Sequence, residues 1–107
     1  MVAVTSHLPA CLAVALVRTV EKLLGGAEGP LLAGPGFASA TRLAKGDPAM
    51  TSQILSQNAE PLSEGIREFV RQLELIGTSL ADPGELEGGL SLACASLDRL
   101  NRRAGQQ

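Results

Sequence analysis

Residues 5–17 read Thr-Ser-His-Leu-Pro-Ala-Cys-Leu-Ala-Val-Ala-Leu-Val, and this stretch decides the fold. Its last ten residues, 8–17, carry no charge, and Ala and Leu, which favour helix, dominate them. A helix that is apolar on every side is expected to be covered by partners all round. Ten residues are too few to span a bilayer, which needs about 20. The run therefore predicts a buried core helix and no membrane segment.

Polar residues and a proline mark the entrance to this helix. Pro9 donates no backbone hydrogen bond and clashes with the carbonyl four residues back, at Thr5. A kink or a helix start is therefore expected where Thr5, Ser6 and His7 lie. His7 is the only histidine of the chain. A lone histidine is more often structural than functional, yet it can also be a base, a proton shuttle or a ligand, so the residues alone leave both interpretations open.

Length and composition predict one all-α domain. The chain has 107 residues, enough for one modest core. Hydrophobic residues make up 45% of it and aromatic residues only 2%, so Leu, Val, Ile and Ala must build a core of closely packed helices. The net charge of −2 provides no basic surface for nucleic acid and no polybasic patch for anionic lipid. No His, Cys and carboxylate groups stand together at metal-ligand spacings, so no metal site is expected.

The two cysteines and the N-terminus suggest the compartment. Cys11 and Cys94 lie far apart in apolar helical contexts, which predicts buried, reduced thiols and a cytoplasmic protein. No basic region precedes the first apolar run, which argues against a signal peptide. The chain opens on its core helix without a capping residue. This beginning is expected of a chain from which upstream residues have been removed.

Hydrophobic periodicity and capping residues predict about five helices in a single domain over residues 1–107. The expected spans are about 2–24, 37–45, 48–57, 59–80 and 83–103, with a glycine- and proline-rich loop over residues 25–36. Asp47-Pro48 and Asp82-Pro83 each provide an N-cap followed by a proline at the first helical position. Asn58 is a candidate cap for the fourth helix. The first helix is too apolar for a thin monomer, so a second chain is expected to cover it.

Three short motifs follow one another in a set order. They are Ser6-His7-Leu8-Pro9 before the apolar helix, Gly36-Phe37 with Thr41-Arg42-Leu43-Ala44, and Asp47-Pro48 with Met50. Their order and spacing resemble the C-terminal domain of the prephenate and arogenate dehydrogenases of tyrosine biosynthesis, over about residues 2–80. The resemblance implies a helical domain that forms a homodimer and completes a pocket for prephenate or arogenate. It also implies a separate N-terminal dinucleotide-binding domain that holds NAD or NADP.

The resemblance also assigns roles to three residues. Ser6 and His7 would line the substrate pocket, and Arg42 would bind a substrate carboxylate. It places no catalytic, cofactor-binding or metal-binding residue in this chain. From the residues alone, Arg42 could instead form a salt bridge with Asp47 or Glu60.

The sequence departs from the family pattern at several positions. Ala10 stands where many prephenate-preferring members have a second histidine, and Thr51 where many have a tryptophan. An aliphatic residue after Ser-His-Leu-Pro is similar to the arogenate-type enzymes of cyanobacteria, so arogenate is slightly favoured. The family's cofactor domain and its catalytic histidine are not in these residues. We therefore expect the chain alone to be inactive and not to bind NAD(P); the alternative is a standalone helical interaction or regulatory module without catalysis.

Overall fold

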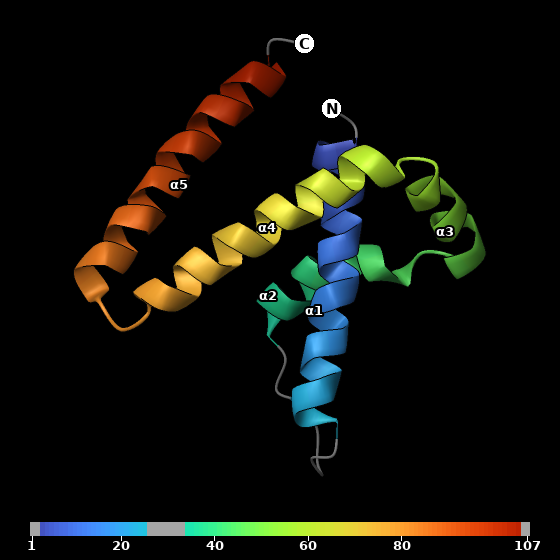
Figure 1. The fold of residues 1–107 in the computed structure, drawn as a ribbon, viewed down its shortest axis with the longest axis horizontal. Coiled ribbons are helices and arrows are strands. Elements are labelled where there is room, and N and C mark those ends of the chain that lie inside the picture. Colours follow the sequence, from blue (N-terminus) through green and yellow to red (C-terminus); the bar gives the residue numbers. More distant parts are fainter. Residues whose placement is uncertain (1–2, 26–33, 106–107) are drawn as a thin grey trace. The chain divides into compact units, whose positions relative to one another are not determined.

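The computed structural model describes residues 3–25 and 34–105, and almost all of them are helical (Figure 1). The elements follow in the order η1 (Ala3–His7), α1 (Leu8–Leu24), α2 (Pro35–Thr41), η2 (Arg42–Lys45), α3 (Pro48–Ser56), α4 (Ala59–Ser79) and α5 (Pro83–Gly105). Here η1 is a π-helix and η2 a 3-10 helix. No strand occurs in the described ranges. The all-α class with five α-helices, expected from the sequence, is confirmed.

The entrance to the first helix is irregular, as Pro9 predicted. The π-helix η1 ends at His7, and Pro9 lies in the first turn of α1. Because Pro9 has no N–H for the carbonyl of Thr5, the backbone changes from a wide π-turn to an α-turn at this point. The structure thus has a helix start where a kink or a helix start was expected, because α1 begins at Leu8, directly after the π-turns of η1.

The first helix is longer than its uncharged run. It continues from Ala3 to Leu24 over 22 residues, and by length and composition it could cross a membrane. The sequence argument considered only the run 8–17, and the flanking turns of the same helix add length at little cost in charge. Core helices of soluble proteins and signal sequences meet the same criterion. The expected absence of a membrane segment stays a prediction.

Helix α2 begins earlier than expected. Gly34 is its N-cap in an extended conformation, and Pro35 is the first helical residue. The predicted loop over 25–36 was therefore wrong at its end, because proline is well suited to the first helical position, where its missing N–H needs no partner. The middle of that loop, residues 26–33, lies outside the described residues. At the other end of α2, the chain tightens into η2 from Arg42.

Aspartate caps begin both α3 and α5, as predicted. The Oδ2 atom of Asp47 accepts a hydrogen bond from the Met50 backbone N–H at 3.2 Å. The Oδ1 atom of Asp82 accepts from the backbone N–H groups of Gly84 at 3.1 Å and Glu85 at 3.2 Å. These bonds satisfy amide groups that have no partner within a helix.

The side chain of Asn58 forms its hydrogen bond with α3, the helix before it, and not with α4, the helix after it. Its Nδ2 group donates to the Ile54 carbonyl at 2.8 Å, so it closes the C-terminal end of α3. Asn58 also stands directly before α4, and its carbonyl accepts from the Leu62 N–H at 3.0 Å, but no side-chain bond from Asn58 to α4 is found among the described residues. The two helices follow so closely that the side chain reaches back to a free carbonyl of α3.

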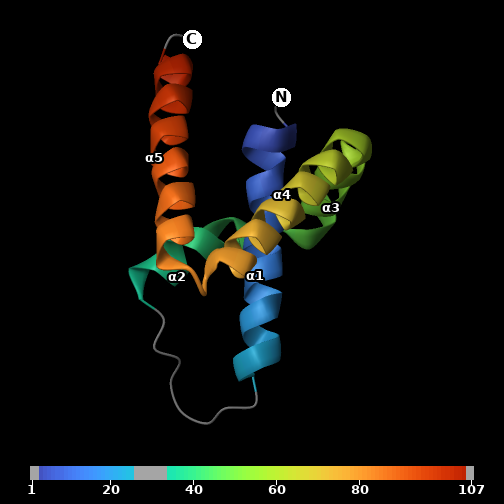
Figure 2. The same ribbon diagram turned by 60° about the vertical axis from the view of Figure 1, so that its left-hand side comes forward.

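The chain divides into two compact units, residues 1–67 and 68–107. In the first unit, α2 and η2 pack against α1 (Figure 1, Figure 2). The buried apolar residues of the described chain are Ala3, Ala13 and Leu62, all in this unit. Helix α4 begins in the first unit and ends in the second, so the units share it. A single domain over residues 1–107 stays a prediction.

The second unit contains the C-terminal part of α4 and the whole of α5. A turn at residues 80–82 joins the two helices, and Asp82 N–H donates to the Ser79 carbonyl at 3.0 Å. Ser79 is buried, with 7% of its surface exposed. Most large apolar side chains of this unit are exposed by comparison, namely Val70, Leu73, Leu75, Ile76, Leu80, Leu90, Leu92, Leu97 and Leu100.

Candidate functional site

Ser6 and His7 lie at the junction of η1 and α1. His7 occupies the N-cap position of α1 with helical dihedral angles, φ −86° and ψ −33°, and its side chain makes no capping hydrogen bond. A capping side chain accepts from the second or third residue of the helix, and here the second residue is Pro9, which has no N–H. Ser6 is exposed and His7 is half-buried. The change from π-helix to α-helix therefore places a hydroxyl and an imidazole at the start of the apolar helix α1.

The imidazole of His7 has one sealed nitrogen. Its Nδ1 atom is buried and has no hydrogen-bond partner, and no other side-chain nitrogen or oxygen within residues 3–25 and 34–105 shares this condition. A buried polar atom without a partner costs about 1–3 kcal/mol. This feature could not be predicted from the sequence, because it depends on how η1 and α1 meet.

Arg42 begins the 3-10 helix η2, directly after the buried residue Thr41. Its neighbour Thr41 is buried, with 9% exposed, and donates its hydroxyl to the Phe37 carbonyl at 2.7 Å. Helix η2 packs against α1. The backbone of Arg42 is therefore held from both sides, while its side chain is exposed.

The Arg42 guanidinium forms no ion pair with a described residue. The salt bridge found in the described ranges joins Arg71 and Glu68, with 2.9 Å between Nη1 and Oε2. The alternative partner Asp47 instead accepts from the backbone of Met50. The predicted alternative, a salt bridge from Arg42 to Asp47 or Glu60, is absent from this structure.

The first unit contains all three predicted site residues. Ser6 and His7 continue directly into α1, and η2 with Arg42 packs on the same helix. No hydrogen bond links Ser6, His7 and Arg42 to one another in the part of the chain that is described. The arrangement provides hydrogen-bond donors on elements that meet at α1, without a closed catalytic network.

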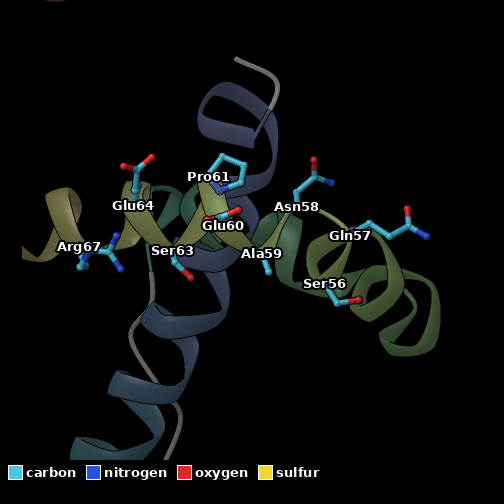
Figure 3. Close-up of a pocket in the computed structure, with 9 residues that line it drawn as sticks. All are labelled: Ser56, Gln57, Asn58, Ala59, Glu60, Pro61, Ser63, Glu64 and Arg67. Atoms are coloured by element: carbon cyan, nitrogen blue, oxygen red, sulfur yellow. The ribbon is translucent and has the colours of Figure 1, made fainter.

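A surface hollow of about 930 Å³ lies elsewhere, at the turn between α3 and α4 (Figure 3). It contains none of the predicted site residues. Its lining residues are Ser56, Gln57, Asn58, Ala59, Glu60, Pro61, Ser63, Glu64 and Arg67. Figure 3 shows Glu64 and Ser63 projecting from opposite sides of α4, so the polar side chains do not converge. No motif in the sequence indicated this hollow, and its side chains form no set of ligands.

The two cysteines are unpaired and differ in exposure. Cys11 is half-buried, and burial raises the pKa of its thiol above the ordinary value. Cys94 is exposed, so its expected burial is wrong: it lies on α5, whose apolar face is uncovered. Within the described residues, no group of His, Cys, Asp and Glu could hold a metal ion. Cytoplasmic location stays a prediction.

Comparison with known families identifies this helical arrangement. The family described as "Prephenate dehydrogenase, dimerization domain" matches residues 1–87, which include Ser6, His7 and Arg42. The chain belongs to this family. No curated protein matched the sequence.

A solved structure shows the same fold. The crystal structure of Synechocystis arogenate dehydrogenase matches the dimerization domain with a TM-score of 0.78 and 24% sequence identity. The match covers 92% of this chain and 37% of the Synechocystis chain. The dimerization domain therefore spans little more than a third of that structure, and its last helix continues beyond the residues that the family match covers.

Proposed function

We propose that this dimerization domain is the C-terminal part of an NAD(P)-dependent prephenate or arogenate dehydrogenase. In that enzyme it would pair two subunits and complete the substrate pocket. The observation that carries the proposal is the family match over residues 1–87. The parent enzyme would move a hydride from a cyclohexadienyl substrate to NAD(P)⁺ while the ring loses CO₂ and becomes aromatic. Ala10 in place of a second histidine slightly favours arogenate as the substrate.

NAD or NADP would be held by a separate N-terminal domain. Dinucleotide binding of this kind uses a glycine-rich turn between a strand and a helix. The described residues contain no strand and so offer no such turn. The described residues therefore do not fit the cofactor, and their proposed role is to bind and orient the substrate.

Arg42 is proposed as the substrate anchor. A guanidinium carries five N–H donors and grips a carboxylate with two parallel hydrogen bonds. The exposed Arg42 side chain has no competing ion pair among the described residues, and Thr41 and α1 fix its backbone. An arginine whose backbone is held in place and whose guanidinium has no ion pair is suited to a ligand that carries carboxylates.

Dimerisation is proposed to cover the apolar faces that the single chain leaves exposed. On α4, Val70 is 45%, Leu73 is 50% and Ile76 is 47% exposed. Burying apolar surface stabilises association by about 25 cal/mol per Å². The expected partner is a second copy of the chain, in contact through α1 and α4.

The test of the substrate role uses the protein that carries both domains. Arg42→Lys keeps the charge but loses the two-pronged contact, so kcat/KM for the preferred substrate should fall at least tenfold, about 1.4 kcal/mol. The melting temperature should stay nearly unchanged. Arg67→Lys, on α4, is the matched control and should leave both quantities unaltered.

Two results would contradict this assignment. A lower melting temperature with normal kinetics would make Arg42 a structural residue. Absence of prephenate and arogenate turnover in the unaltered two-domain protein would refute the proposed reaction and favour a helical interaction module.

A further inference from the structure

We infer that neutral His7 carries its ring proton on Nε2 and donates a hydrogen bond to a substrate oxygen instead of accepting a proton. The identity of the ligand rests on the proposed function. The position of the proton is a property of this chain and can be measured without a substrate.

The sealed Nδ1 atom is the basis of the inference. It is buried and without a partner. Side chains in a helix lean over the preceding turn, toward the helix N-terminus. For His7 that turn begins at Ala3, which is only 7% exposed. The burial of Nδ1 agrees with this lean, because the ring atoms near the backbone would lie over a turn whose first residue is buried.

The sequence explains why Nδ1 finds no donor. At the N-cap position, this nitrogen would ordinarily accept from the N–H of the second or third helical residue. Pro9 removes the first of these donors, and the structure shows no capping bond to the other. With Pro9 at the second helical position, Nδ1 is thus left with neither a donor nor an acceptor.

The two neutral forms of the ring differ in what they bury at Nδ1. One buries a bare lone pair, and the other buries an N–H group. Among buried backbone groups, orphaned N–H donors are rarer than under-satisfied carbonyl acceptors, and we apply the same preference to the ring. The form with the proton on Nε2 is therefore favoured, and it leaves the donor on the outer edge of a half-buried ring.

This proton position determines what His7 can do chemically. With Nε2 protonated, the outer nitrogen offers a donor and cannot remove a proton from a ligand. The remaining lone pair is on the sealed Nδ1. Together with the Arg42 guanidinium, which has donors and no acceptor, the neutral imidazole suits an oxygen-rich anion such as a carboxylate. His7 is then a binding residue and not a general base.

Nitrogen NMR of the chain tests the proton position directly. His7 is the only histidine, so labelling with ¹⁵N-histidine gives signals from one ring. At a pH where the ring is neutral, Nε2 should show the shift of a protonated nitrogen and Nδ1 that of a bare one. The opposite pattern, or two averaged shifts from a mixture of forms, would overturn the inference.

Two substitutions test the donor role in the protein that carries both domains. The amide nitrogen of Gln reaches about as far as Nε2, and that of Asn about as far as Nδ1. His7→Gln should keep kcat/KM within about threefold, whereas His7→Asn should lower it about tenfold or more, the effect of losing one hydrogen bond to a charged group. The loss in His7→Asn should appear mainly in KM.

The outcomes separate this inference from the proposed function. Equal losses in His7→Gln and His7→Asn, or a smaller loss in His7→Asn, would contradict the donor role. If the unaltered protein turns over neither substrate, the proposed function fails, and the NMR result alone decides the proton position.

Discussion

Helix α4 runs through both units of the molecule, and its two halves have different surroundings. Leu62 in the first half is 5% exposed, whereas Leu73 and Leu80 are 50% and 64% exposed. All three belong to one apolar stripe, spaced by three and four residues along the helix, that consists of Leu62, Ile66, Phe69, Val70, Leu73, Ile76 and Leu80. In the first half, a Cβ added to Gly65 would lie 3.4 Å from Leu8 Cδ2, so the start of α1 covers this face. The stripe determines which face of a helix is apolar. What covers that face depends on a second segment.

The same difference distinguishes the two units as a whole. The first unit buries small residues, Ala3 and Ala13, where helices approach closely. The second unit presents leucines on α5, such as Leu97 at 58% exposed, without a buried apolar residue of its own among those described. The first unit therefore has the beginnings of a core, and the second depends on an external surface, which we propose is the partner subunit.

The largest expected effect comes from placing a charge in the first unit. Ala13 is 1% exposed on α1. Ala13→Asp would bury a carboxylate without a partner and should lower the free energy of unfolding by about 3 kcal/mol or more. Ala38→Asp, at an exposed position on α2 in the same unit, is the control and should cost about 1 kcal/mol or less. Urea unfolding followed by circular dichroism measures both, and equal losses would mean that the first unit has no core at Ala13.

A charge on the second half of α4 should affect association more than folding. Leu73→Glu places a carboxylate in the proposed dimer interface, so the dissociation constant of the dimer should rise about a hundredfold. Thr78→Glu, off the apolar stripe of the same helix, should change it little. Sedimentation equilibrium at several concentrations measures both variants. A stable monomer in the unaltered chain at tens of micromolar would show that no second copy covers this face.

Loss of a capping aspartate should have a smaller effect on stability. Because each unit has one such aspartate, the two substitutions compare the units directly. Asp47 accepts one backbone N–H at the start of α3, and Asp82 accepts two at the start of α5. Each substitution by Ala should lower the free energy of unfolding by about 1 kcal/mol, with the larger loss for Asp82→Ala. Asp98→Ala, in the interior of α5, is the control. Equal stability of Asp82→Ala and the unaltered chain would show that α5 is not part of the cooperative unit.

Local chemistry made much of the fold predictable from the sequence. Asp-Pro pairs give helix starts because the carboxylate accepts orphan N–H groups and the proline needs none, and both starts were found at Pro48 and Pro83. Pro9 likewise predicted the break at His7. The side-chain bond of Asn58 to α3 was not predicted, because an amide can both donate and accept, and only the structure shows which neighbour it meets.

The candidate site was less predictable than the fold. The motifs singled out Ser6, His7 and Arg42, but sequence spacing carries no information on burial. The sealed Nδ1 of His7 and the unpaired Arg42 guanidinium both depend on how η1, η2 and α1 pack. Cys94 was expected to be buried because its helix face is apolar, and it is exposed because that face has no cover within the chain.

The smallest expected effect concerns an exposed carboxylate at the start of the second unit. Glu68 accepts hydrogen bonds from Gln72 Nε2 at 2.7 Å and from Arg71 Nη1 at 2.9 Å, and these bonds lower its pKa below the ordinary 4.5. A pKa lowered by folding contributes stability above the unfolded pKa, and this contribution is lost as the pH falls through the folded pKa. Because Glu68 is fully exposed, solvent screening keeps the contribution small.

The variant Gln72→Ala isolates this contribution through its pH dependence. It removes the first cause of the lowered pKa, so the variant should lose less stability than the unaltered chain between about pH 6 and pH 3. Alanine also favours helix, and that gain should be the same at every pH. Gln53→Ala on α3, away from any carboxylate contact in the described residues, should show the helix gain alone. Urea unfolding at a series of pH values measures the difference, and parallel curves for Gln72→Ala and the unaltered chain would show that the Gln72 bond contributes nothing to the stability of the second unit.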